Sequence, residues 1–252
     1  MNFAINGSSD PKGAIIPVAN YGEGYDPSLG PSYVATLFYN GDDTSPAVLS
    51  DFQGGILPAS NTTELLPITM AEFAELVFPE FEPGGASYGL QQRFHVVSTA
   101  VTREAMDIVH DTYFNAVLSF GLANKTGFIT GLAWNAITTQ FIAATNNGTG
   151  CPQGIPEEPV FWVEQSTSWA DAADNDLIEE FVVTVNANIT AQLEAVNATR
   201  SYTYLNDADQ GQEVFQTYPA VNLIRLKEIR DKYDPDLVFT NLMPGGFKVA
   251  SA

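Results

Sequence analysis

The sequence predicts an α+β fold in which an antiparallel β-sheet is covered on one face by helices. Short segments rich in β-branched and aromatic residues recur along the chain and are bounded by Gly and Pro, as strands are. Helical segments alternate with these strands irregularly, and several strand pairs have only loops between them. Because parallel pairing needs a longer crossover, usually a helix, this order favours antiparallel pairing with the helices on one side.

The composition is that of an acidic globular protein. Of 252 residues, 45% are hydrophobic and 12% aromatic, which is enough for a sizeable core. A formal net charge of −20 argues against nucleic acids and anionic membrane surfaces as partners. Residues 201–252 hold 7 acids and 5 bases, a net −2, so the other −18 lies in residues 1–200.

The first predicted elements are two strands and a short helix. Ile15–Ala19 and Tyr33–Tyr39 are β-branched and aromatic runs, and the segment between them is a loop rich in Gly and Pro. Ser45–Phe52 is predicted to be a short helix.

A helix with a clear start signal follows at Thr69–Phe78. Thr69 is its expected N-cap, and Glu72 lies three residues later, which is the spacing of a capping box. Pro83-Gly84-Gly85 then breaks the chain, and Gln91–Thr99 is the next predicted strand.

The middle of the chain is predicted to form a helix, a strand and a loop. The helix covers Thr102–Phe120, because apolar residues recur there at helical spacing: Met106, Val109, Tyr113 and Val117. Phe128–Ile137 is predicted to be a strand, and Asn146–Pro159 is a loop rich in Gly and Pro.

The strand at Val160–Ser168 has the strongest signal, and the longest helix follows it. Ser168 is the expected N-cap, Asp171 lies three residues later, and further acidic residues crowd the positive end of the helix dipole. The expected core face consists of Ile178, Phe181, Val182, Val185, Ile189 and Val196.

The C-terminal region is predicted to hold a last strand and an amphipathic helix. The strand is Tyr202–Asn206, and the helix is Val221–Tyr233. Asp234-Pro235 ends this helix, because the residue before a proline is pushed out of the α region. Its expected buried stripe is Asn222, Leu226, Ile229 and Tyr233.

Glu164 is the candidate catalytic residue. It lies among aromatic residues on a predicted central strand, where desolvation would raise its pKa and suit it to accept a proton. The alternative is a glutamate that faces solvent or a charged partner. Trp134 and Trp162 are candidates for lining a substrate pocket, with core packing as the alternative.

Other reactive residue types give weaker signals. His95 and His110 are expected to be satisfied core or surface residues, and Cys151 is expected to be incidental. The sequence contains no GxGxxG motif after a strand, no GxxxxGK[ST], CxxC or HExxH motif and no GxSxG elbow, so no metal site and no phosphate-binding loop is predicted.

The chain has more N-glycosylation sequons than chance predicts. About two or three Asn-x-Ser/Thr sites are expected by chance, whereas this chain has six. No apolar run is long enough to span a membrane, and the first residues do not read as a signal peptide. The excess nevertheless predicts a secreted glycoprotein modified at Asn6, Asn61, Asn124, Asn147, Asn188 and Asn197.

Four short motifs in the last fifty residues occur in an order that resembles a known family. In order, they are Tyr204-x-Asn206, Asn222-x-x-Arg225-Leu226, Lys232-Tyr233-Asp234-Pro235-x-x-Val238-Phe239 and Pro244-Gly245-Gly246-Phe247-Lys248. This order is similar to the C-terminal segment of fungal FAD-linked oxidoreductases of the berberine bridge enzyme type, within the vanillyl-alcohol oxidase group. The resemblance continues at Ser168-Trp169-x-Asp171-Ala172 and near the N-terminus, in NFAINGSSDPKGAIIPVANY.

The resemblance implies a cofactor, a site and a division of the chain. It implies FAD, with Tyr204 and Asn206 beside the flavin ring and Asn222 a further contact. It also implies that residues 1–200 form an N-terminally truncated substrate-binding domain and that residues 201–252 return to an FAD-binding domain absent from this chain.

The function expected from the resemblance is that of a secreted FAD-dependent oxidoreductase. Such an enzyme passes a hydride from a small organic substrate to FAD and then to oxygen, and this chain alone is expected to be inactive. The alternative is a non-catalytic secreted glycoprotein or binding module that uses the same sheet.

Overall fold

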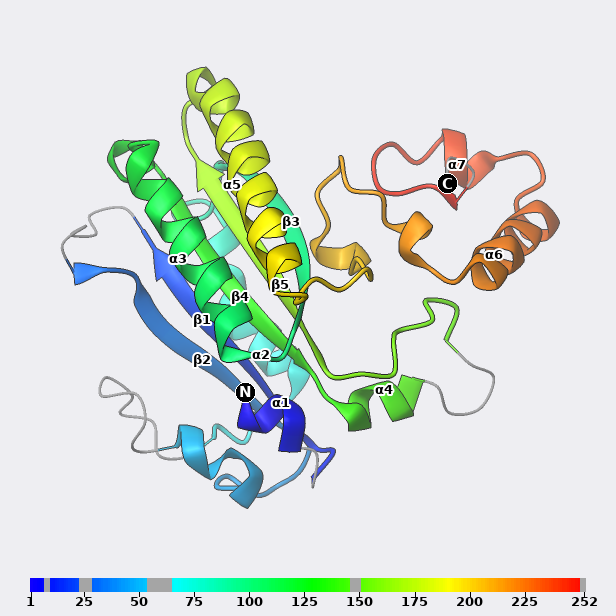
Figure 1. Cartoon of the computed structure of the whole chain (residues 1–252), viewed down its shortest axis with the longest axis horizontal. Helices are drawn as coiled ribbons and strands as arrows, with labels where there is room; N and C mark the ends of the chain where they lie inside the picture. Colours follow the sequence, from blue (N-terminus) through cyan, green and yellow to red (C-terminus); the bar gives the residue numbers. More distant parts are fainter. Residues whose placement is uncertain (7–9, 23–28, 54–64, 146–150, 250–252) are drawn as a thin grey trace.

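The computed structural model describes residues 1–6, 10–22, 29–53, 65–145 and 151–249. Its centre is a five-stranded sheet in the order β2-β1-β4-β5-β3, in which every neighbouring pair is antiparallel (Figure 1). The strands are β1 (Gly13–Tyr21), β2 (Ser32–Tyr39), β3 (Gln91–Ala100), β4 (Ile129–Ile137) and β5 (Val160–Trp169). The predicted fold class is therefore confirmed.

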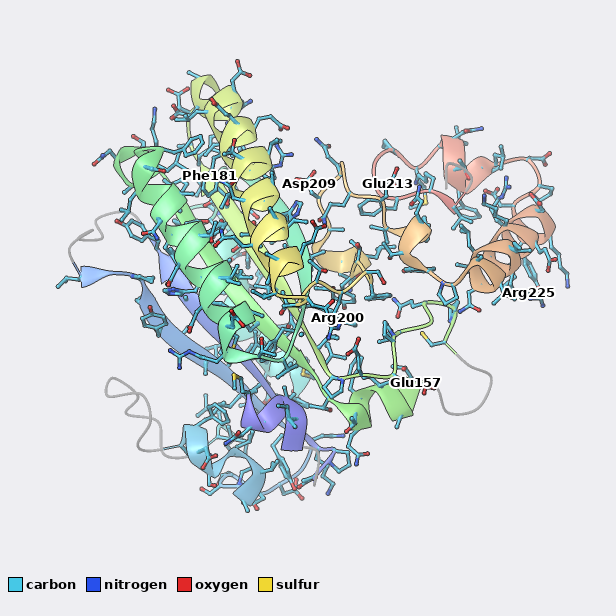
Figure 2. The ribbon with its side chains drawn as sticks, viewed as in Figure 1. Glu157, Phe181, Arg200, Asp209, Glu213 and Arg225 are labelled. Carbon is cyan, nitrogen blue, oxygen red and sulfur yellow. The ribbon has the colours of Figure 1, made fainter. Side chains whose placement is uncertain are left out.

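Two long helices, α3 (Arg103–Ser119) and α5 (Asn175–Ala195), cover one face of this sheet (Figure 1). Thr102 caps α3 by accepting the N–H of Ala105 at 3.1 Å. The rings of Tyr113 on α3 and Phe181 on α5 meet edge to face, with centroids 5.4 Å apart, and Figure 2 shows Phe181 between the two helices. The helices and strands share one buried core that includes Val109, Val117, Leu132, Phe161, Val163, Ile178, Val185 and Ile189.

Two buried polar clusters hold the helices to the sheet. The hydroxyl of Tyr113 lies 2.5 Å from Thr130 Oγ1 and 3.0 Å from Thr167 Oγ1. The amides of Gln165 on β5 and Asn186 on α5 form two hydrogen bonds with each other, at 2.6 and 3.0 Å. Buried amides are stable only when they are paired in this way, so these contacts fix which residues of β5 face the helices.

The other face of the sheet lies away from α3 and α5 and is called here the open face. Strand registers align one residue of each strand in a single row across it: Val34, Val18, Ala133, Glu164 and Val96. These residues alternate with the helix-facing ones, because successive side chains of a strand point to opposite faces.

The segment that follows α5 packs on the β3 side of the open face. Buried apolar residues from this segment, from α4 (Thr139–Thr145) and from the strands form a second core, which includes Val96, Ile142, Val160, Trp162, Tyr202, Val214 and Tyr218. The C-terminal helices α6 (Ala220–Tyr233) and α7 (Val238–Asn241) lie farther out, and Figure 2 shows Arg225 on α6 at the periphery.

The outer edge of β3 is protected by the same segment. The side chain of Gln212 accepts the N–H of Val96 at 3.0 Å and donates to its carbonyl at 2.9 Å, as a neighbouring strand would. Arg93 pairs with Asp209 at 2.5 Å and also with Glu179. The two Gln212 hydrogen bonds satisfy backbone groups that an unpaired edge would leave open.

Two predicted elements on this side of the molecule differ in the structure. The strand predicted at Tyr202–Asn206 is wrong, because residues 201–204 are irregular and a 3-10 turn covers Leu205–Asp207. Side chains rather than a neighbouring strand satisfy this backbone, since Ser98 Oγ donates to the carbonyl of Tyr202 and Thr217 Oγ1 accepts the N–H of Thr203.

The start and end of α5 also differ from the prediction. Ser168 belongs to β5, and Asp171 caps a short 3-10 turn, Ala172–Asp174, from which α5 begins. Val196 lies beyond the helix and is exposed, so it is not part of the buried face.

The helix predicted at Ser45–Phe52 is a 3-10 helix over Ala47–Phe52. The Thr69–Glu72 capping box is confirmed, and it starts α2 (Met70–Val77). Asp234 ends α6 as predicted. The prediction that one stripe of α6 is buried is wrong for this chain, because no residue of α6 is buried and Tyr233 is 71% exposed. The residue patterns did not predict the three short helices α1 (Asn2–Asn6), α4 and α7.

Within the described ranges, no helix combines the length and apolarity needed to cross a membrane.

Candidate functional site

Glu164 lies near the middle of β5 on the open face of the sheet. Its strand neighbours Val163 and Gln165 face the helices, and its cross-strand partners are Ala133 on β4 and Val96 on β3. The Glu164 side chain is therefore set in an apolar row and is only partly exposed. Burial raises the pKa of Glu164 to about 7, and the nearby Asp207 carboxylate adds to the increase. Near neutral pH this carboxyl group can both hold and release a proton.

A stack of aromatic rings stands beside Glu164, two residues back along β5. Trp162 is 2% exposed, and its ring stacks on Tyr204 with centroids 4.4 Å apart and an interplanar angle of 17°. Tyr202 packs on the same indole at 5.1 Å, and Tyr218 stacks on Tyr202 at 5.8 Å. The four rings come from β5 and from the segment after α5, so the tertiary fold builds this aromatic wall.

Asn206 and Asp207 lie on the turn that follows the stack. Asn206 is exposed, and its Nδ2 donates to the hydroxyl of Tyr204 at 2.8 Å. Asp207 accepts from Asn135 Nδ2 at 3.4 Å, and burial raises the pKa of its carboxyl group. The turn and the residue before it therefore carry an amide, a phenol and a second carboxyl group, and the carboxyl group of Asp207 lies near Glu164.

The structure brings four of the sequence-predicted residues together: Glu164, Trp162, Tyr204 and Asn206. Asn222 lies apart from them on α6, where its Nδ2 is 3.5 Å from the carbonyl of Cys151. Trp134 lies on the helix-covered face, in the core beneath α3, with its ring stacked at 6.5 Å on His110. Trp134 therefore does not join the group on the open face.

The surroundings of the two histidines are those of structural residues. His95 is paired with Gln165 in the sheet register, and burial lowers the pKa of His95 to about 4. His110 contacts Tyr33 at 2.9 Å and Asp111 at 2.7 Å on the side of the sheet that α3 covers. In the part of the chain that the structure describes, no group of three His, Cys, Asp or Glu residues is arranged to hold a metal ion.

Three of the six sequons have asparagine side chains exposed to solvent in the structure: Asn124, Asn188 and Asn197. The side chain of Asn6, and the whole of Asn61 and Asn147, lie outside the described residues.

Sequence reasoning did not find Asp207, Asn135 or the Tyr202–Tyr218 stack as parts of the site. Asn135 and Asp207 are 72 residues apart, and only the pairing of β4 with β5 brings Asn135 to the open face. The alternation of Tyr202 and Tyr204 was the available signal for the stack, because side chains two residues apart point to the same side of an extended segment.

The chain is related in sequence to fungal FAD-dependent monooxygenases. It is 26% identical over 99% of its length to the FAD-dependent monooxygenase prx3 of Penicillium roqueforti, and 21% identical over 99% of its length to the FAD-dependent monooxygenase tpcD of Cochliobolus heterostrophus. A shorter match, 33% identical over 39% of this chain and 19% of that protein, is to the bifunctional solanapyrone synthase of Alternaria solani. No family model matches the chain.

Solved structures of oxidoreductases share the fold. Aclacinomycin oxidoreductase aligns with a TM-score of 0.55 at 14% identity over 91% of this chain and 46% of that one. The 6-hydroxy-D-nicotine oxidase of Arthrobacter nicotinovorans aligns with a TM-score of 0.56 at 15% identity over 88% of this chain and 46% of that one. The predicted resemblance to FAD-linked oxidoreductases is confirmed. The chain spans about half the length of the relatives that it matches from end to end, 48% in each case.

Proposed function

We propose that this chain, a relative of fungal FAD-dependent monooxygenases, is the substrate-binding part of an FAD-dependent oxidoreductase. In this proposal, residues 1–200 form the substrate-binding domain and residues 201–252 contact the domain that binds FAD. The observation that carries it is the juxtaposition on the open face of Glu164, whose pKa is raised to about 7, with the Tyr204–Asn206 pair and the Trp162 ring.

These residues fit the ring end of FAD. A flat aromatic wall, an exposed amide and a phenol are groups that pack against a flavin ring and hydrogen-bond its polar edge. They do not fit the pyrophosphate, because the ionisable group beside Glu164 is a second carboxylate, Asp207. The proposed arrangement therefore assigns the pyrophosphate to the FAD-binding domain and only the ring to the open face.

When bound, FAD would accept a hydride from the substrate and return the electrons to oxygen. The role of this chain is to place the substrate and to move its proton. With its pKa near 7, the carboxylate of Glu164 accepts a proton from a substrate hydroxyl or amine as the adjacent carbon is oxidised. Tyr204 and Asn206, fixed by their hydrogen bond, orient the reacting groups, and the buried Trp162 ring supports the Tyr204 ring by stacking on it.

The exposed C-terminal helix supports the proposed domain contact. Large apolar residues of α6, of α7 and directly after α7 are exposed in this chain, including Val221, Ile224, Tyr233, Phe239 and Leu242. Exposed apolar residues gathered in this way mark an interaction surface. Residues 201–252 are also nearly neutral, with a net charge of −2, whereas residues 1–200 carry a net −18. In the proposal, the FAD-binding domain covers this surface.

Secretion is the proposed localisation, and the exposed sequons at Asn124, Asn188 and Asn197 support it. Production in a eukaryotic secretory host, followed by peptide mapping with a glycosidase, tests these three sites. Unmodified asparagines at all three in such a host would contradict this part of the proposal.

The flavin role is tested by the spectrum of the purified protein. We expect flavin absorbance when FAD and the FAD-binding portion are present, and we expect Asn206→Ala to slow flavin reduction in that loaded form. Asn124→Ala, an exposed substitution outside the site, is the matched control. A protein that stays colourless when FAD and the FAD-binding portion are supplied would favour the alternative, a non-catalytic secreted glycoprotein. An unchanged reduction rate in Asn206→Ala would remove Asn206 from the site.

A further inference from the structure

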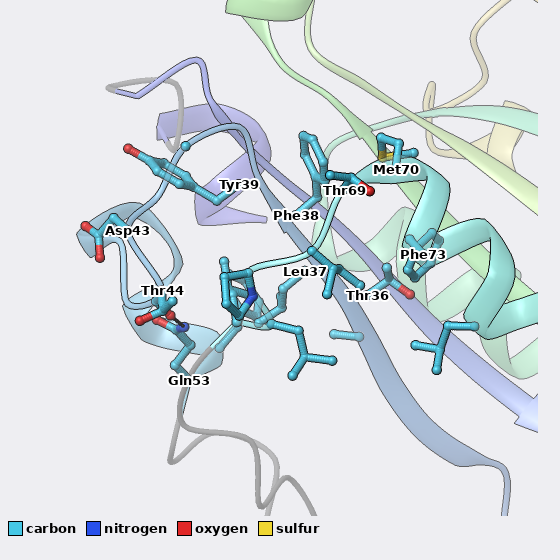
Figure 3. Close-up of a pocket in the computed structure, with 18 of the residues that line it drawn as sticks. Thr36, Leu37, Phe38, Tyr39, Asp43, Thr44, Gln53, Thr69, Met70 and Phe73 are labelled. Atoms are coloured by element: carbon cyan, nitrogen blue, oxygen red, sulfur yellow. Dashed lines mark hydrogen bonds between the residues drawn. The ribbon is translucent and has the colours of Figure 1, made fainter.

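A large cavity lies on the open face between the edge strand β2 and the helix α2 (Figure 3). Its volume is ≈ 950 Å³, at the upper end of the roughly 300–1,000 Å³ that small-molecule sites occupy. Its lining includes apolar residues of the strand and the helix, among them Val34, Phe38, Met70, Phe73 and Leu76, and residues of the segments around Asp42 and Leu65.

Helix α2 stands away from the sheet with its apolar side chains uncovered. The helix is well formed, since Thr69 Oγ1 accepts the N–H of Glu72 at 3.2 Å and the Glu72 carboxylate accepts the N–H of Thr69 at 2.7 Å. None of its residues is buried, however, and Met70 and Leu76 are 65% and 62% exposed. An apolar molecule between α2 and β2 would remove this apolar surface from water, which favours binding.

The charges around the cavity select against anions. Among the described lining residues, the charged ones are Asp42 and Asp43, and none is basic. The polar lining groups Gln53 and Thr69 already hydrogen-bond to Thr44 O and to Glu72, at 3.0 and 2.9 Å. A neutral, mostly apolar molecule meets these walls without desolvating a charge, whereas a carboxylate or phosphate would find two carboxylates and no basic side chain among the described lining residues.

An apolar strip of the open face joins this cavity to Glu164. Val34, which lines the cavity, is paired with Val18, Val18 with Ala133, and Ala133 with Glu164. Three strand spacings of about 4.8 Å place Glu164 about 14 Å from Val34 along this row. Neither Val18 nor Ala133 is fully buried, so a bound molecule can lie on them.

We infer that the cavity between β2 and α2 holds the body of an elongated, neutral and predominantly apolar organic substrate. The molecule extends over Val18 and Ala133 and presents its reacting group to Glu164. The role of Glu164 rests on the proposed function, whereas binding in the cavity does not.

The inference is tested with two probes that share a decyl tail, both below their micellar concentrations. Tetraethylene glycol monodecyl ether is neutral, and decyl sulfate is anionic. We expect the neutral probe to shift the backbone amide resonances of Val34 and Phe73 in the cavity and of Ala133 and Glu164 beyond it. We expect decyl sulfate to bind at least about tenfold more weakly, because of Asp42 and Asp43.

Matched variants locate the binding. Phe73→Asp and, separately, Leu76→Asp place a carboxylate in the cavity wall at partly exposed positions, and each is expected to weaken binding of the neutral probe at least about tenfold. Phe78→Asp, at an exposed aromatic residue of the next turn that does not line the cavity, is expected to leave binding unchanged.

Several results would overturn the inference. These are equal binding of the two probes, resonance shifts that stop at the cavity and do not reach Ala133, and equal losses in Phe73→Asp and Phe78→Asp. Self-association of the chain that Phe73→Asp abolishes would show that a second copy fills the cavity. Because the titration contains no flavin, failure of the flavin role would leave the probe binding unchanged, so the two failures are distinguishable.

Discussion

The raised pKa of Glu164 is the property on which the proposed chemistry depends, and replacing Asp207 perturbs it. Burial is the larger cause of the increase and the Asp207 carboxylate the smaller one. With a pKa of about 7, about 90% of Glu164 is protonated at pH 6, whereas a glutamate at its ordinary value of 4.5 would be about 3% protonated. Asp207→Asn removes the negative charge with little change of shape. It should lower the pKa of Glu164, but not as far as 4.5, because the burial remains.

The assay is a carboxyl-carbon NMR titration of the whole chain labelled at glutamate. Glu72 is an internal control on α2, because hydrogen bonds from the backbone and side chain of Thr69 lower its pKa. We expect Glu164 to titrate last among the glutamates in the wild type and earlier in Asp207→Asn, with Glu72 unchanged. A Glu164 resonance that titrates with the exposed glutamates, or one that Asp207→Asn leaves in place, would refute this reasoning.

Three further predictions concern stability and the protected edge. Folding raises the pKa of Glu164, so the contribution of this residue to stability is full below about pH 4.5 and is lost as pH rises through about 7. Glu164→Gln should therefore flatten the pH dependence of the unfolding free energy, measured by chemical denaturation, between these two pH values. A parallel loss of stability in the wild type and in Glu164→Gln would contradict this prediction. Asn186→Ala leaves the buried amide of Gln165 without its partner and should lower the unfolding free energy by about 1–3 kcal/mol. The measurement is urea denaturation, with the exposed substitution Asn188→Ala as the control. Equal stability of the two variants would show that the amide pair contributes nothing. Gln212→Ala removes both side-chain hydrogen bonds to Val96 and should speed hydrogen exchange of the Val96 amide. The Val163 amide, in the sheet interior, is the reference. Unchanged exchange at Val96 would show that another group protects this edge.

The five strands and two long helices followed from local patterns. Each strand run was long enough to show β-branched and aromatic enrichment, and the helices α3 and α5 showed apolar residues at helical spacing. The Thr69–Glu72 capping box was also predictable, because both of its partners lie within one turn. These elements needed no knowledge of tertiary contacts.

The errors came where distant contacts decide the structure. Tyr202 and Tyr204 alternate as in a strand, yet they pack on Trp162, and side chains bond their backbone. The stripe on α6 suggested burial, but this chain leaves Tyr233 exposed. A helical pattern shows that a face is apolar and does not show what covers it.

Those parts of the candidate site that lie within one local segment were predictable, and their assembly was not. Glu164 and Trp162 were found because they share one strand, and Tyr204 and Asn206 because they share one motif. Their assembly with Asp207 and Asn135 depends on the register of β4 against β5 and on the path of the chain after α5. The same register, extended to β2, connects Glu164 to the cavity beside α2.

The central claim is that a flavin ring lies on the open face beside Glu164, and a titration of the labelled chain with lumiflavin tests it most directly. Lumiflavin carries the ring without the pyrophosphate, so it probes only the part of FAD assigned to this chain. We predict shifts of the backbone amides of Glu164, Tyr204 and Asn206, weakened by Asn206→Ala and unaffected by Asn124→Ala. Shifts confined to the helix-covered face around Trp134, or no saturable shifts at all, would contradict the account.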